Sequence, residues 1–543
     1  MYNKIDIMNR RHFLSTTASV GALAIIPRSV LGSGFVAPSG KTKFVNDFIQ
    51  SEKIEVNATN SGTPFPHFWE QIFGSGQAIL SLRESYRKDL RLTKENTQMR
   101  YVRFHDIFGD QVGLYTPDRS DKTGVPAAYN YTYIDQIYDG LLEAGVRPFV
   151  ELSFMPRALA DKPSPPSIWY VPNNAPPKDY AVWDDMIEQF VRHLVSRYGI
   201  DELLQWYFEV WNEPDWGFPD GYPRQETYYK LYEHTARIIK KVDSRLRIGG
   251  PATANANWVT RFLKYCHENR IPIDFVATHI YGDGNADDTG DAGGGPGDSL
   301  PSGLKAVPRN QLVSKQIAKV HKQIEESATP HLPFIISEFN ASWMNLHDVL
   351  DTVYMGPWMA DTIRQCDGLV DMMSFWAFSD VFEEEGVARK PFYGGFGFIA
   401  TGNIPKPAFN AFALLHKLGD TRLQADSESA LVTRRADGAL IIALWNYAES
   451  SANPDSSKPS KTFELALTGI SKNAKVQMSR LDETHGNVLV EYKAMGEPAW
   501  PTREQTARLQ AAAKLTPPET MSLNNGHLHV EIPPRGLVLL EIH

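Results

Sequence analysis

The sequence predicts an α/β fold, a (β/α)8 TIM barrel with an accessory all-β sandwich domain. Between about residues 65 and 420, short apolar runs alternate with amphipathic helices, which indicates a parallel sheet. Eight such units in about 350 residues are the size of a barrel with insertions. After about residue 420 the pattern changes to short β-type runs separated by turns, which is typical of a sandwich. A doubly wound open sheet is the alternative, but no Gly-rich phosphate turn follows the first strand.

The barrel elements are predicted from short apolar runs, read as strands, and from apolar residues at helical spacing. For example, Ile134, Ile137 and Leu141 share one helix face, and Gly145 ends that helix. The expected strands are residues 69–74, 100–104, 147–152, 204–211, 246–250, 274–280, 333–338 and 371–377. The expected helices are residues 83–97, 133–144, 183–198, 226–242, 257–268, 311–327, 357–366 and 407–418.

Two insertions interrupt the alternation. Residues 161–178 are rich in proline, and residues 282–303 are rich in glycine and aspartate. The second insertion has a superficial likeness to a calcium loop. An EF-hand loop needs glycine at its sixth position and glutamate at its twelfth, and neither is present. We therefore expect a flexible loop over the barrel mouth and no metal site.

The N-terminal residues 1–40 are predicted to be an export signal and a disordered segment. The basic stretch Arg10-Arg-His-Phe-Leu14 precedes a short apolar run, Ala18 to Ile26. The arginine pair resembles a twin-arginine signal, so a periplasmic or secreted protein is expected. Residues 41–64 include a predicted strand at 53–58, which we expect to pair with the C-terminal sandwich.

The remaining boundaries follow from the change of pattern at about residue 420. Residues 65–420 are assigned to the barrel and residues 421–543 to the sandwich.

Composition excludes several classes of function. The 543 residues carry a net charge of −9, which is unsuited to binding nucleic acid or an anionic membrane. No stretch after the N-terminal signal has the roughly 18 uninterrupted apolar residues of a membrane span. The only two cysteines, Cys266 and Cys366, exclude a disulfide framework, and buried thiols are favoured.

Two predicted strands each bring a glutamate to the end where barrels of this kind build their active sites. The run Tyr207-Phe-Glu-Val-Trp-Asn-Glu-Pro-Asp215 places Asn212 and Glu213 at the carboxyl end of the fourth strand. The run Pro333-Phe-Ile-Ile-Ser-Glu-Phe-Asn340 places Glu338 at the corresponding end of the seventh strand. Because barrel closure puts these ends on one rim, both carboxylates are expected at the same site.

A pair of carboxylates is the machinery of glycosidic bond hydrolysis. In retaining enzymes the two groups lie about 5–5.5 Å apart, and in inverting enzymes about 6.5–9.5 Å apart. Neither route needs a metal or an organic cofactor, so none is expected. Sequence does not measure the distance, so the choice of a retaining route depends on a family resemblance.

The strand-end motifs resemble glycoside hydrolase clan A, and Phe208-Glu-Val-Trp-Asn-Glu-Pro-Asp215 resembles its family 39, the β-xylosidase and α-L-iduronidase family. Further segments resemble the family in the same order along the chain. They are Arg103-Phe-His105 through Asp110 and Gly113, Arg147–Pro156, Thr278–Tyr281, Ser374–Glu384 and Pro405–Phe409. The resemblance covers about residues 50–420, and the sandwich fits by type only.

The resemblance implies that Glu213 is the acid/base and Glu338 the nucleophile of a retaining enzyme. It also implies a sugar site around them. Asn212 would contact the 2-hydroxyl, His279 and Tyr281 would lie near the nucleophile, and Trp376 would form a sugar platform. Four residues would hold hydroxyls of the terminal sugar: His105, Asp110, Glu383 and Glu384. One position departs from the pattern, because Asp106 stands where the family's xylosidases have glycine.

Structural roles stay open for several of these residues. His279 and Trp376 are also compatible with the barrel core, and Glu383 and Glu384 belong to an acidic run that is also compatible with a solvated loop.

The expected function is the hydrolysis of terminal glycosidic bonds in oligosaccharides or polysaccharide-derived glycosides, with β-xylosides as the favoured substrates. The alternatives are an α-L-iduronidase-like, arabinopyranosidase-like or uronate-polysaccharide glycosidase. An iduronidase needs basic groups for the substrate carboxylate, and only Arg103 and Arg389-Lys390 lie near the motifs. A non-catalytic carbohydrate-binding protein is the alternative of another class, and the presence of both carboxylates argues against it.

Overall fold

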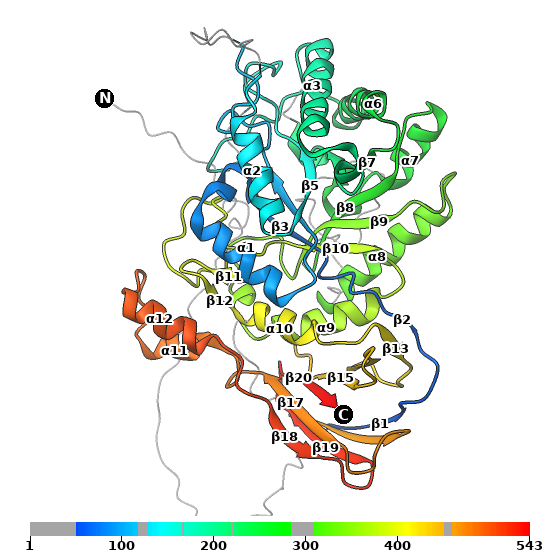
Figure 1. Ribbon diagram of the computed structural model, residues 1–543, viewed down its shortest axis with the longest axis vertical. Coiled ribbons are helices and arrows are strands. Elements are labelled where there is room, and N and C mark those ends of the chain that lie inside the picture. The colour runs from blue at the N-terminus through cyan, green and yellow to red at the C-terminus, as the bar shows by residue number, and fades with distance from the viewer. Residues whose placement is uncertain (1–49, 118–128, 165–167, 219–221, 284–308, 450–458) are drawn as a thin grey trace, which may run out of the picture. The chain divides into compact units, whose positions relative to one another are not determined.

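The computed structural model describes residues 50–117, 129–164, 168–218, 222–283, 309–449 and 459–543 (Figure 1). The predicted export signal and nearly all of the 282–303 insertion lie outside these residues.

Eight parallel strands close into a barrel, which confirms the predicted fold class. Neighbouring strands follow one another in sequence, and the last strand pairs with the first. The barrel strands are β3 (Ile72–Gln77), β4 (Tyr101–His105), β5 (Arg147–Leu152), β6 (Tyr207–Val210), β7 (Arg247–Thr253), β8 (Phe275–Tyr281), β9 (Phe334–Asn340) and β10 (Met372–Phe375).

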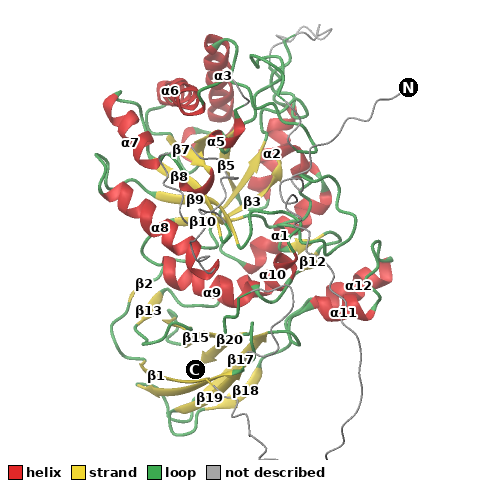
Figure 2. Ribbon diagram, turned by 180° about the vertical axis from the view of Figure 1, so that it is seen from behind, coloured by secondary structure: helices red, strands yellow, loops and turns green. Residues whose placement is uncertain are grey.

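The helices lie around the strands, as Figure 2 shows in red around yellow. All eight predicted helices are present, with ends within three residues of the prediction. They are α1 (Glu84–Asn96), α2 (Thr132–Glu143), α3 (Tyr180–Tyr198), α6 (Arg224–Val242), α7 (Val259–Glu268), α8 (Arg309–Glu325), α9 (Met355–Cys366) and α10 (Pro407–Leu415). Two one-turn helices, α4 (Ile200–Leu203) and α5 (Pro214–Gly217), lie on either side of β6.

Burial on both faces explains why the strands could be predicted. Every residue of β4, β8 and β9 is buried. A parallel strand has helices on one side and the barrel interior on the other, so its sequence is a continuous apolar run. The first strand begins three residues later than predicted, because Trp69 is buried in the turn before β3 rather than in the strand.

The C-terminal region forms two sheets that share one apolar core. A three-stranded sheet has the order β1 (Gln50–Asn57), β16 (Lys461–Thr468) and β19 (His527–Ile532). The other sheet has the order β18 (Glu519–Ser522), β17 (Lys475–Leu481), β20 (Leu537–Ile542), β15 (Leu440–Trp445), β14 (Ala430–Arg434), β13 (Thr421–Leu423) and β2 (Thr63–Pro64). Side chains of both sheets, such as Ile54 and Ile442, belong to the same buried cluster.

The predicted strand at 53–58 is confirmed in its pairing. It is β1, which runs parallel to β16 with Ile54 opposite Leu465. The all-β description of residues 421–543 needs a correction, because α11 (Val488–Ala494) and α12 (Arg503–Ala512) lie between β17 and β18. Their contacts are with the barrel side of the molecule, where Tyr492 packs against Phe392 at a ring distance of 4.8 Å.

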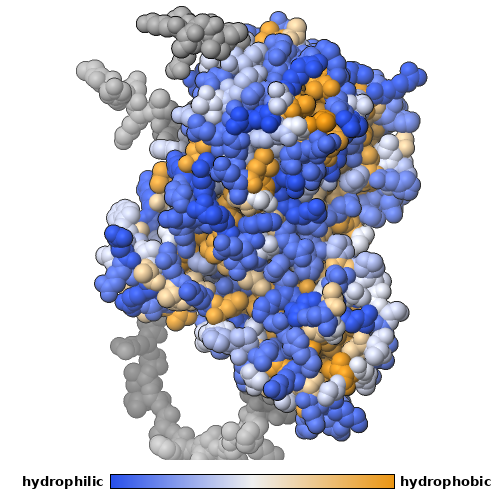
Figure 3. All heavy atoms as spheres, viewed as in Figure 1, coloured by the Kyte–Doolittle hydropathy of each residue, from blue (hydrophilic) through white to orange (hydrophobic). Residues whose placement is uncertain are grey.

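The face of the molecule shown in Figure 3 is mainly hydrophilic. Hydrophobic residues form small patches among hydrophilic ones on the face shown in Figure 3. None of the described helices is long and apolar enough to cross a membrane. Cys266 and Cys366 are buried free thiols, as expected.

Candidate active site

Glu213 lies just beyond the carboxyl end of β6, at the start of α5. Its backbone is left-handed, with φ 43°, and so is that of Trp211, with φ 72°. The Glu213 amide donates a hydrogen bond of 2.8 Å to the carbonyl of Ala252 in β7. Non-glycine residues in this conformation are strained, and such strain is concentrated at functional sites. The carboxylate is thereby turned toward the rim of the barrel.

Glu338 lies in β9, is 4% exposed, and is held by donors from two other strands. The Tyr281 hydroxyl donates to Oε2 at 2.7 Å, and the Arg103 guanidinium donates to Oε1 at 2.7 Å. Hydrogen bonds to the charged form stabilise a carboxylate. The surroundings of Glu338 therefore suit a group that acts as an anion.

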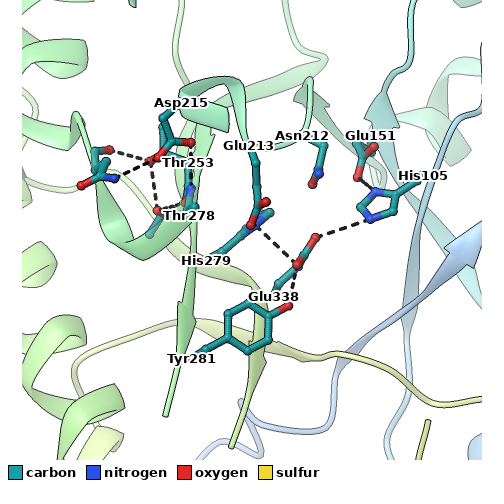
Figure 4. Close-up of polar contacts among 12 residues, drawn as sticks. His105, Glu151, Asn212, Glu213, Asp215, Thr253, Thr278, His279, Tyr281 and Glu338 are labelled. Atoms are coloured by element: carbon teal, nitrogen blue, oxygen red, sulfur yellow. Dashed lines mark hydrogen bonds and ion pairs between the residues drawn. The ribbon is translucent and has the colours of Figure 1, made fainter. Parts of the chain in front are cut away.

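The two carboxylates are close together (Figure 4). Carboxylate oxygens of Glu213 and Glu338 and a ring nitrogen of His279 all lie within 4.8 Å of one another. This close approach of one oxygen from each group agrees with the roughly 5–5.5 Å between the carboxyl groups of retaining glycosidases, which are closer together than the roughly 6.5–9.5 Å of inverting ones. The geometry supports a direct attack by one carboxylate rather than by a water held between them.

Arg103, in β4, is the central cation of the site. Its side chain has no exposure and forms ion pairs with Glu338, with Glu209 at 2.6 Å and with Glu151 at 2.8 Å. It also donates to Oδ1 of Asn212 at 2.9 Å. Asn212 therefore keeps its amide nitrogen as the group available to a ligand. Sequence reasoning considered Arg103 only as a basic group near the motifs and assigned no role to Glu151 or Glu209, although isolated charges inside apolar strands were the visible signal.

His279 lies between the two carboxylates and is neutral. Its pKa is lowered to about 3, first by burial and then by the charge of Arg103 against the opposing effect of Glu338. Arginine cannot accept a hydrogen bond, so the 3.3 Å contact from Arg103 requires Nε2 of His279 to be the acceptor. The ring proton is then on Nδ1, which donates to Glu213 at 3.0 Å and lies 3.5 Å from Glu338.

The same contacts bear on whether a metal could be held here. Glu213, His279 and Glu338 have a ligand-like spacing. However, Arg103 already contacts Glu338 and His279, so a cation would have to displace the guanidinium.

His105, at the end of β4, is paired with Glu151 through Nδ1 at 2.7 Å. Burial would lower its pKa, but the charge and hydrogen bond of Glu151 outweigh burial and raise it to about 9. Nε2 lies 3.6 Å from Glu384 and 3.8 Å from Glu338. The structure thus brings His105 and Glu384 to the same cluster as the two central carboxylates.

Trp376 lies against this cluster and is 2% exposed. Its ring is 4.7 Å from the ring of His105 and 5.5 Å from the Arg103 guanidinium carbon. Gly74 makes room for the ring, since a Cβ there would lie 2.0 Å from a ring atom. This position suits Trp376 both as a platform for a sugar ring and as a packing residue of the barrel core.

Two residues that were predicted to contact the sugar, Glu383 and Asp110, form ion pairs with arginines instead. Glu383 forms an ion pair with Arg83. Asp110 forms an ion pair with Arg157 and also accepts a 3.1 Å hydrogen bond from the backbone amide of Arg157. The structure does not bring either carboxylate to the His105–Glu338 cluster. Both roles stay predictions from the family resemblance.

Asp106 has a backbone conformation that favours glycine, the residue that the family resemblance implies at this position. Its φ is 68°, which favours glycine. The carboxylate is turned toward Gly109, where a Cβ would lie 2.2 Å from it, and it accepts a 3.4 Å hydrogen bond from the Phe154 amide. Burial is the main cause of a pKa raised to about 7. The departure therefore adds a buried acid beside His105 and Ser153.

Asp215 forms a second buried network beside Glu213 (Figure 4). Its oxygens accept from the Ala254 amide at 3.0 Å and from the Asn257 side chain at 2.9 Å. Thr253 and Thr278 lie 3.3 Å apart in the same network. Asp215 thereby joins α5 to the loop after β7, so the two loops that flank Glu213 are tied together.

Comparison with known proteins gives a consistent result. A family model described as glycosyl hydrolases family 39 matches residues 52–526. A β-xylosidase of Geobacillus stearothermophilus is 36% identical over 482 residues, which cover 88% of this chain and 92% of the relative. Human α-L-iduronidase is 24% identical over 177 residues, 30% of this chain and 25% of the relative. The structure of a GH39 β-xylosidase from Caulobacter crescentus has a TM-score of 0.77 at 30% identity and covers 91% of this chain and 100% of that chain.

Proposed function

Because the chain belongs to glycosyl hydrolases family 39, we propose that it is a β-xylosidase with Glu338 as nucleophile and Glu213 as acid/base. It is a retaining glycoside hydrolase, like the β-xylosidases of the family. The observation that carries the assignment of the two residues is the close approach of their carboxylate oxygens, within 4.8 Å.

The first step of the reaction forms a bond between Glu338 and the anomeric carbon. The Glu213 carboxyl gives its proton to the departing glycosidic oxygen as that bond breaks. In the second step Glu213, now a carboxylate, takes a proton from water. The water oxygen attacks the anomeric carbon, and the Glu338 carboxylate leaves. Two inversions give net retention.

The surrounding residues serve these two steps by controlling charge. Tyr281 and Arg103 stabilise Glu338 as a carboxylate, both before the first step and when it leaves in the second. Neutral His279 donates to Glu213 without adding a charge.

A neutral sugar suits the site better than a uronate. Arg103, the buried guanidinium at the centre of the site, is already paired with three glutamates. Arg389 and Lys390 are exposed. A uronate carboxylate would therefore meet several glutamates, while the two buried cations, Arg103 and His105, are already paired with glutamates. Burying an uncompensated charge costs several kcal/mol.

The test is a panel of aryl glycosides under identical conditions, followed by proton NMR of the first-formed sugar. We expect the β-D-xyloside to have the highest kcat/KM and β-xylose to appear before its anomer. A higher kcat/KM for the α-L-iduronide or the α-L-arabinopyranoside would replace the β-xylosidase proposal. No turnover of any glycoside would favour the non-catalytic binding protein.

Export is a second proposal, supported by the Arg10-Arg11 pair and the apolar run that follows it. Residues 1–40 fused to a reporter should direct it out of the cytoplasm. Replacing both arginines with lysine should abolish this, and unchanged export would argue against the twin-arginine route.

A further inference from the structure

Residues 168–170 of the Pro-rich insertion lie against the loop that carries Glu384 of the active site. The insertion, residues 161–178, follows β5, and its Trp169 amide donates a 2.9 Å hydrogen bond to the Glu384 carbonyl. The Trp169 ring packs on Gly386, where a Cβ would lie 3.3 Å from ring atoms. Residues 168–170 are therefore fixed to the loop that carries Glu384, the carboxylate 3.6 Å from His105.

Two adjacent aromatic residues of this segment have opposite surroundings. Trp169 is 64% exposed. The Tyr170 hydroxyl is buried and has no hydrogen-bond partner among the described residues. A buried hydroxyl without a partner is destabilising by about 1–3 kcal/mol. A group of this kind at the edge of a ligand site is expected to have its partner in the ligand.

The hydrogen bond from the adjacent Trp169 amide to the Glu384 carbonyl places Tyr170 beside the loop that carries Glu384, and the electrostatics of Tyr170 agree with this position. Burial raises the pKa of Tyr170 well above 10, and the charges of Glu384, Asp106, Glu151 and Glu338 raise it further. These carboxylates belong to or adjoin the cluster around His105. Ionised carboxylates only accept hydrogen bonds, whereas a neutral phenol donates one.

We propose that Tyr170 is a substrate-binding residue whose hydroxyl donates a hydrogen bond to a hydroxyl group of the terminal sugar. The sugar hydroxyl accepts a hydrogen bond from Tyr170 and donates one to a neighbouring carboxylate, for which Glu384 is placed. Tyr170 thereby selects a glycone that bears a hydroxyl at this position. The assignment rests on the proposed glycosidase function.

The test compares wild type with Tyr170→Phe on an aryl β-xyloside and on its 2-, 3- and 4-deoxy analogues. For the parent xyloside, kcat/KM should fall about 3- to 10-fold, the effect of one neutral hydrogen bond. For one of the deoxy analogues, the two proteins should have equal kcat/KM, because the bond is already absent. An unchanged kcat/KM for the parent would overturn the proposal, and so would an equal loss on the parent and all three analogues.

Stability separates substrate binding from a structural role. Tyr170→Phe removes a hydroxyl without a partner, so its unfolding temperature should equal or exceed that of wild type. A lower unfolding temperature would show that the hydroxyl is bonded within the protein and would contradict the proposal. Tyr138→Phe is the matched control, because that hydroxyl is also buried without a partner but packs between Phe104 and Trp206, away from the site. It should leave kcat/KM unchanged on every substrate.

Failure of the Tyr170 proposal can be distinguished from failure of the proposed β-xylosidase function. If wild type does not hydrolyse the xyloside, the β-xylosidase proposal fails. The comparison is then made with the aryl glycoside that wild type does hydrolyse and with its monodeoxy analogues, with the same expected and contradicting results for Tyr170.

Discussion

Replacement of Asp215 by asparagine should stabilise the protein in neutral and alkaline solution, with no effect in acid. Asp215 is 4% exposed, and its pKa is raised to about 7 from the ordinary 3.8, first by burial and also by the charge of Glu213. The native state therefore binds this proton more tightly than the unfolded state. The contribution of protonated Asp215 to the free energy of unfolding is fully present below about pH 4 and is lost as the pH rises toward 7.

The size of the effect follows from the difference in pKa. About three pH units correspond to roughly 4 kcal/mol between the protonated and ionised forms. Asparagine is never charged, and its side chain has an oxygen for the Ala254 amide. The amide of Asn257 can rotate to accept from the new amide nitrogen. The variant should therefore gain up to about 4 kcal/mol over wild type above pH 7.

The assay is urea-induced unfolding of both proteins at pH 4, 6 and 8. The unfolding midpoints should coincide at pH 4 and diverge progressively at pH 6 and 8, with the variant higher. A variant less stable than wild type at pH 8 would show that ionised Asp215 stabilises the fold, and would refute this reasoning.

Three further substitutions test the contacts of the site and of the C-terminal sheets. Tyr281→Phe removes a hydrogen bond to the charged Glu338, which is worth about 1.5–3 kcal/mol. The kcat should therefore fall at least tenfold, and the glycosyl-enzyme should accumulate. A wild-type kcat would show that Glu338 does not depend on this donor. Arg103→Met leaves three buried glutamates without their cation, so it should destabilise the protein by about 3–5 kcal/mol. The measurement is the urea midpoint of unfolding, which should be lower in the variant. An unchanged midpoint would contradict the ion pairs. Ile54→Asp places a charge in the core shared by the two C-terminal sheets and should also lower the midpoint by several kcal/mol. If that variant unfolds like wild type, β1 contributes little to the domain.

The barrel could be predicted from sequence because its strands differ from everything around them. Strand β9, for example, is buried at every position, so its sequence is an apolar run with no solvent-facing alternation. Helices α11 and α12 were missed because they are short and interrupt a region of strands. Thr502 and Gln505 form a capping box at the start of α12, and this pattern was visible in the sequence.

The candidate site was partly predictable for a related reason. Glu213 follows β6 and Glu338 lies near the carboxyl end of β9, and barrel geometry places these ends on one rim. Arg103 and its partners Glu151 and Glu209 lie within strands, where a single charge carries no information about its partner until the strands are closed into a barrel. Tyr170 belongs to an insertion without periodicity, so no pattern indicated which way its side chain points.

The most direct test of the central claim is the product formed by Glu338→Gly with azide and an aryl β-xyloside. If Glu338 is the nucleophile, the variant has lost its turnover, and azide occupies the vacated space and attacks the anomeric carbon once. Proton NMR should then show the α-xylosyl azide, the product of a single inversion. Formation of the β-xylosyl azide, or wild-type turnover without azide, would contradict the assignment of Glu338.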